Sequence, residues 1–158
     1  MTLGAYTDAA EGRSLLAGRY RDVIDVLGSH GLRFKQDGLA ASTNLCVAYI
    51  MTHRWREAHP ACDEAIGFAK LEMPDRIGLS MGAYDERVAI AYSNRAVLEW
   101  LEARSTSAAD DLARAHALAP SAELVAQNLA RLHASLTAAG SASSPRGSAP
   151  ATAMAAHG

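Results

Sequence analysis

The feature that most constrains this chain is a pattern of small residues that recurs at fixed distances from two asparagines. Alanines lie 14 and 21 residues after each of them, as Asn44, Ala58 and Ala65 and again as Asn94, Ala108 and Ala115. A third asparagine, Asn128, begins the sequence Asn-Leu-Ala 34 residues after Asn94. The 50 residues between the first two asparagines exceed that period by 16. A spacing of this kind predicts repeated helical units with an insertion between two of them.

Small side chains have a physical role in such a unit. Cys46 and Ala96 occupy matching places on the first helix of each expected pair, and Ala58 and Ala108 occupy matching places on the second. Two helix axes can approach to about 8–10 Å only where the side chains between them are small. The pattern therefore predicts two closely packed helical hairpins.

The residues around these positions resemble the tetratricopeptide repeat (TPR), a helix-turn-helix unit that stacks into a solenoid. The segments TNLCVAY at 43–49, ACD at 61–63 and AYSNRAVL at 91–98 resemble small proteobacterial TPR proteins to which no function has been assigned. The resemblance implies an all-α solenoid with two clear repeats, at 39–70 and 84–120. A weak helical pair would precede them and a closing helix would follow.

Composition agrees with an all-helical chain. Hydrophobic residues make up 49% of the sequence but aromatic residues only 6%, and much of the remainder is alanine, which favours helices. We expect one domain over 1–138, with helices at about 5–16, 39–52, 56–70, 83–103, 107–118 and 121–138. Residues 71–83 form the insertion. The tail at 139–158 is rich in Ala, Ser, Gly and Pro and is expected to be disordered.

Motifs for enzymatic chemistry are missing from the sequence. No pair of histidines has the spacing of a zinc helix, and no GxxxxGK[ST], GxGxxG or GxSxG occurs, so no catalytic residue, metal or cofactor is predicted. The net charge of −2 and the lack of a basic stripe argue against nucleic acid. No apolar run approaches the roughly 20 residues that span a membrane. The sequence therefore predicts a non-enzymatic protein.

The family resemblance implies a partner-binding face at fixed offsets from each repeat asparagine. On this chain those offsets, together with the second asparagine, give a largely apolar set: Val47, Ile50, Met51, Asn94, Val97, Trp100, Leu101 and Arg131. An exposed patch of this composition would bind a peptide or protein. The cations with which chaperone-binding TPRs hold a C-terminal carboxylate are missing, so that ligand is not expected.

Two functions are compatible with this face. The first is an interaction module, a scaffold or adaptor whose concave face binds a protein partner. The alternative is a mainly structural protein in which the face is covered, either by the apolar residues of the 71–82 insertion or by a second copy in a homo-oligomer.

The two cysteines and the N-terminus bear on the compartment. Cys46 and Cys62 lie on the two helices of one repeat, on facing sides, where a disulfide could form and add about 3 kcal/mol. Their positions alone favour two buried thiols, because free cysteine is among the most buried residue types. The first 15 residues lack a basic segment followed by an apolar core. As written, the chain is expected in the cytoplasm, or in the periplasm if its N-terminus is a trimmed mature boundary.

Overall fold

The computed structural model describes the chain except for residues 10, 31–37, 72–79 and 143–158. The described residues form helices and no strand, which confirms the all-α class. The helices are α1 (Gly12–Leu16), α2 (Tyr20–His30), α3 (Gly38–Met51), α4 (Trp55–Leu71), α5 (Met81–Leu101), α6 (Ser105–Leu118) and α7 (Glu123–Ala142). None of them is long and apolar enough to cross a membrane, as far as the described residues go.

Three of the turns between helices share one backbone structure. Gly18, His53 and Ala103 have positive φ angles of 69°, 57° and 60°, and each lies two residues before the next helix. In each turn the N–H of this residue donates to the carbonyl three positions earlier, and the N–H of the following arginine donates to the carbonyl five positions earlier. This is the Schellman ending of a helix. The pairs α1–α2, α3–α4 and α5–α6 are therefore joined in the same way.

The centre of the molecule is formed by α3 and α5. Twelve of the 14 residues of α3 are buried, because α3 packs against α2, α4 and α5. Helix α5 packs in turn against α6 and α7. The small residues Cys46 and Ala58 belong to the core cluster between α3 and α4, and Ala96 and Ala108 to a cluster between α5, α6 and α7. All four are fully or almost fully buried.

The expected element boundaries hold in the middle of the chain and shift at its ends. The helix expected over 5–16 is confined to Gly12–Leu16, and residues 1–6 are not helical. Helix α7 continues to Ala142, four residues into the tail that was expected to be disordered. Helix α5 begins at Met81 after Ser80, whose hydroxyl accepts a hydrogen bond from the Ala83 N–H, so the insertion is shorter than 71–83. Its residues 72–79 and the tail 143–158 lie outside the described residues.

Candidate functional site: an asparagine row and its occupant

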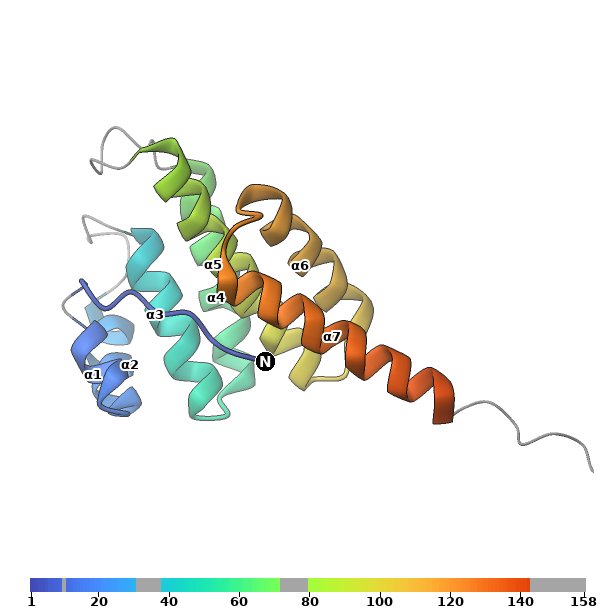
Figure 1. The fold of residues 1–158 in the computed structure, drawn as a ribbon. Helices are drawn as coiled ribbons and strands as arrows, with labels where there is room; N and C mark the ends of the chain where they lie inside the picture. The colour runs from blue at the N-terminus through green and yellow to red at the C-terminus, as the bar shows by residue number, and fades with distance from the viewer. Residues whose placement is uncertain (10, 31–37, 72–79, 143–158) are drawn as a thin grey trace, which may run out of the picture.

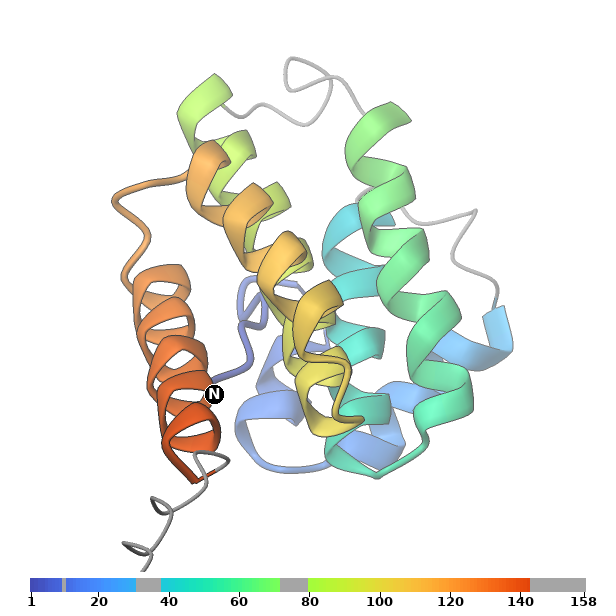
Figure 2. The same cartoon turned by 90° about the vertical axis from the view of Figure 1, so that its right-hand side faces the viewer.

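Three asparagines from different helices form a row across α3, α5 and α7. Asn44, Asn94 and Asn128 are each fully buried. The partner of all three is the N-terminal segment, residues 1–6, which crosses α3 and ends near α7 (Figures 1 and 2). The segment thus lies on the same side of α3, α5 and α7 and links their asparagines.

Each asparagine makes a pair of hydrogen bonds with one residue of the segment. Its Oδ1 accepts from the backbone N–H and its Nδ2 donates to the carbonyl of the same residue. The pairs join Asn128 to Thr2 (2.6 and 2.7 Å), Asn94 to Gly4 (2.8 and 2.7 Å) and Asn44 to Tyr6 (2.8 and 3.0 Å). The Asn128 Nδ2 also donates to Ser93 Oγ at 2.9 Å.

This geometry explains why asparagine stands at all three positions. A side-chain amide carries both a donor and an acceptor, so it can satisfy the N–H and C=O of one extended residue, which would otherwise be buried without partners. Alternate residues of an extended chain present these groups to the same side. The row therefore binds the peptide backbone and does not read the side chains of residues 2, 4 and 6.

The side chains of the segment are held by separate contacts. Leu3 and Ala5 pack against the core cluster of α2, α3 and α4, and Met1 packs with Trp100 against the cluster of α5, α6 and α7. The guanidinium of Arg131 donates to Thr2 Oγ1 at 3.2 Å. Both apolar anchoring and polar contact thus hold the segment on the face.

Tyr6 anchors the end of the segment nearest α3. The residue is 8% exposed, its hydroxyl donates to the carbonyl of Arg87 at 2.8 Å, and the Arg87 guanidinium lies over the ring at 4.5 Å from its centre. Such a cation–π contact contributes about 0.5–2 kcal/mol. Gly12 allows the chain to turn after this point, because a Cβ there would lie 2.4 Å from the Tyr6 carbonyl oxygen.

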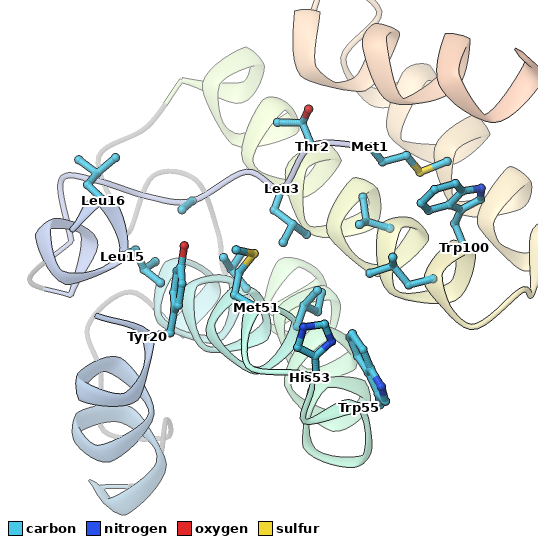
Figure 3. A pocket seen from close by; sticks show the side chains of 15 residues that line it. Met1, Thr2, Leu3, Leu15, Leu16, Tyr20, Met51, His53, Trp55 and Trp100 are labelled. Carbon is cyan, nitrogen blue, oxygen red and sulfur yellow. The ribbon is translucent and has the colours of Figure 1, made fainter. Parts of the chain in front are cut away.

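A pocket of about 640 Å³ remains beside the segment. Its walls come from residues 1–3 and Ala5, from α1 and the start of α2, and from the C-terminal ends of α3 and α5 (Figure 3). His53 and Trp55, whose rings meet edge to face with centres 5.0 Å apart, lie at its rim beside Met51. Most of the lining is apolar, so the pocket can accept an apolar side chain.

The structure brings the predicted face together at this pocket. Its six apolar members all line it: Val47, Ile50, Met51, Val97, Trp100 and Leu101. Val47, Ile50 and Val97 are buried, Trp100 is half-buried, and Met51 and Leu101 remain 44% and 48% exposed. Asn94 lies in the asparagine row, and Arg131 is exposed at its end, where it contacts Thr2.

Sequence reasoning missed the occupant of the face. It considered the 71–82 insertion as the cover, most of which lies outside the described residues, and read residues 5–16 as a helix. The structure instead places residues 1–6 on the face. The signal was the three asparagines, which recur on three helices of the repeat pattern and need hydrogen-bond partners when buried.

Cys46 and Cys62 are joined in the structure by a disulfide, with S–S 2.10 Å and Cα–Cα 4.9 Å. The positions of the two cysteines in the sequence favoured two buried free thiols instead. Position alone could not separate the two, because both need small, facing, buried sites. The bridge connects α3 to α4 two residues from Asn44, and so fixes the helix that carries one end of the asparagine row.

A second polar cluster lies between α4, α5 and α6. Arg95 donates to both carboxylate oxygens of the buried Asp111 (2.6 and 2.8 Å) and to Asp63 (2.7 Å). Glu99 lies on the same helix, and its Oε2 is buried without a hydrogen-bond partner. Burial raises the pKa of Glu99, and the negative charge of Asp111 raises it further. Within the described ranges, no three His, Cys, Asp or Glu side chains are placed to hold a metal ion.

Comparison with known proteins found no matching family model, no similar curated protein and no similar solved structure.

Proposed function

We propose that this protein is a non-enzymatic scaffold or adaptor module that binds an extended segment of a protein partner through the asparagine row and the adjoining apolar pocket. The observation that carries the proposal is the set of three paired hydrogen bonds between Asn44, Asn94 and Asn128 and alternate residues of an extended chain. Main-chain bonds of this kind supply affinity, while pockets for alternate side chains supply specificity.

The proposal includes a TPR-like arrangement of the helices. It is supported by the three matching turns after α1, α3 and α5 and by small buried residues at corresponding places in α3–α4 and α5–α6. In such an arrangement the first helix of each pair lines a shared concave face. Asn44 and Asn94 occupy the same position on two such helices, and Asn128 continues the row on α7.

One observation favours the alternative function, a structural protein with a permanently covered face. The chain's own residues 1–6 satisfy every asparagine of the row. A tethered segment competes with any partner at an effective concentration of about millimolar. The two functions therefore differ in whether the segment can be replaced.

Replacement can be measured with a fluorescent peptide of residues 1–9 and a Gly4→Val variant of the full chain. A Cβ at residue 4 would lie 2.7 Å from Ile90 Cγ2, so the variant's own segment should leave the groove while the asparagines remain. We expect anisotropy to show peptide binding at least roughly tenfold tighter than to the unsubstituted chain. Gly82→Val is the matched control, because a Cβ at Gly82 meets open space.

The second arm tests the row itself. Asn94→Ala in the Gly4→Val background removes two hydrogen bonds of about 1 kcal/mol each and should weaken peptide binding roughly thirtyfold, while circular dichroism remains helical. A folded Gly4→Val protein that binds no peptide would instead support the structural alternative.

A further inference from the structure

We infer that the partner segment is an extended protein chain with the order apolar residue, glycine, large apolar residue, tyrosine, and that it displaces residues 1–6 by filling the pocket that Ala5 leaves open. This inference rests on the proposed function and adds the sequence that the groove prefers. It follows from the places that residues 3 to 6 of the chain occupy now.

The glycine requirement comes from the close approach of the backbone to two helices. The paired hydrogen bonds to Asn94 hold residue 4 against α5 and α7. A Cβ there would lie 2.7 Å from Ile90 Cγ2 and 3.3 Å from Leu124 Cδ1. The first distance is shorter than side-chain carbons tolerate, and a branched isoleucine methyl has little freedom to move away. Any other residue at this position loses the hydrogen bonds or displaces the helices.

The tyrosine requirement comes two residues further along. The ring at this site is almost fully buried, its hydroxyl reaches the Arg87 carbonyl at 2.8 Å, and the Arg87 guanidinium covers its face. Phenylalanine could fill the volume but would lose the hydroxyl contact. The Asn44 pair fixes the backbone of the same residue, so the two subsites are locked at a spacing of Gly-x-Tyr.

The residue between the glycine and the tyrosine determines whether the partner segment binds the groove more tightly than residues 1–6 do. Ala5 lines the pocket of about 640 Å³ but contributes only a methyl group to it. A leucine or phenylalanine at this place would extend along apolar pocket residues such as Leu15 and Ile50, which belong to the cluster that Ala5 already packs against. That burial increases affinity roughly tenfold or more. A second copy of this chain carries alanine here and gains nothing over the tethered segment, so the occupant is a different protein.

The test uses the Gly4→Val full chain and four labelled peptides, which are MTLGAYTDA itself and three single-residue variants of it. Replacing Ala5 by Phe should tighten binding at least roughly tenfold. Replacing Gly4 by Ala should weaken it at least tenfold, and replacing Tyr6 by Phe should weaken it several-fold. Equal binding of all four would overturn the sequence preference and leave the backbone-binding function standing. Binding of none by the folded protein would overturn the function itself.

A second measurement does not depend on displacement. In the otherwise unsubstituted chain, Ala5→Phe should raise the melting temperature, because the tethered side chain would fill the same pocket. Thr7→Phe is the matched control, since residue 7 does not line the pocket and should give no rise. A lowered melting temperature for Ala5→Phe, or concentration-dependent dimers of the Gly4→Val chain by light scattering, would contradict the inference.

Discussion

Gly4 and Asn94 are 90 residues apart in the sequence and exchange two hydrogen bonds, with the Gly4 N–H donating at 2.8 Å and the Asn94 Nδ2 donating to the Gly4 carbonyl at 2.7 Å. The contact combines two requirements. Only a residue without a Cβ fits between Ile90 and Leu124, and only a side-chain amide satisfies both backbone groups at once. The groove therefore recognises a chain by its backbone and by how closely that backbone can approach.

Asn94→Ala should release the middle of the N-terminal segment. Two hydrogen bonds are lost, each contributing about 1 kcal/mol, so we expect the free energy of unfolding to fall by about 2 kcal/mol in urea titrations. The Gly4 amide should also exchange with solvent much faster. Gln127→Ala is the control, because this exposed amide on α7 bonds only Glu123 in the described contacts and should change stability by less than about 0.5 kcal/mol. Equal stability of the two variants would argue against the pairing.

The Cys46–Cys62 disulfide should stabilise the half of the groove that α3 provides. The bridge closes a loop with a sequence separation of 16, for which loop entropy gives about 3 kcal/mol. Dithiothreitol should therefore lower the urea midpoint of the unsubstituted chain. The Cys46→Ala/Cys62→Ala double variant should show the lower midpoint with or without reductant. If dithiothreitol does not change the urea midpoint of the unsubstituted chain, Cys46 and Cys62 are free thiols.

The helices could be predicted from the sequence because their signals are local and repeated. Asn44 and Asn94 begin matching patterns, and the small residues Cys46, Ala58, Ala96 and Ala108 mark where helices must approach. These small residues mark the close approach of two helices that follow each other in the chain, so spacing alone identifies them. The apolar face was found for the same reason, since Val47 and Val97 lie three residues after their asparagines.

The N-terminal segment could not be predicted in this way. Its partners lie 38, 90 and 126 residues away, and nothing local shows that residues 2, 4 and 6 are extended. Glycine and alanine between larger residues are compatible with several structures. The asparagines were assigned to the repeat pattern alone, although three buried amides on one face also require three backbone partners.

Ala103→Gly should stabilise the protein, because Ala103 adopts a positive φ of 60° in a turn where glycine is unstrained. The left-handed conformation costs a residue with a Cβ about 1 kcal/mol, part of which is offset by the greater freedom of glycine in the unfolded chain. We expect a net gain of up to about 1 kcal/mol in chemical denaturation. The same substitution at Ala134, exposed in α7, should lower stability by about 1 kcal/mol. If Ala103→Gly and Ala134→Gly lower the free energy of unfolding by the same amount, alanine is not strained at position 103.

Glu99→Gln should stabilise the protein at neutral pH and lose its advantage in acid. Burial raises the pKa of Glu99 above its ordinary value of 4.5, and its Oε2 has no partner, so the folded state binds the proton more tightly than the unfolded state does. The contribution of Glu99 to stability is fully present below pH 4.5 and is lost as the pH rises through the higher folded pKa.

At pH 7 the glutamine variant avoids that loss, and because the side chain is partly exposed the gain should be at most about 1 kcal/mol. Urea titrations of both proteins at pH 7 and pH 4 measure the difference directly, and taking the difference cancels the titration of every other shared carboxylate. Ala134→Gly on the surface of α7 changes no titrating group and serves as the control, because its stability difference should be the same at both pH values. A stability gap for Glu99→Gln that widens toward pH 4 would mean that the carboxylate is stabilised in the folded state, through Arg95 or another cation, rather than penalised by burial.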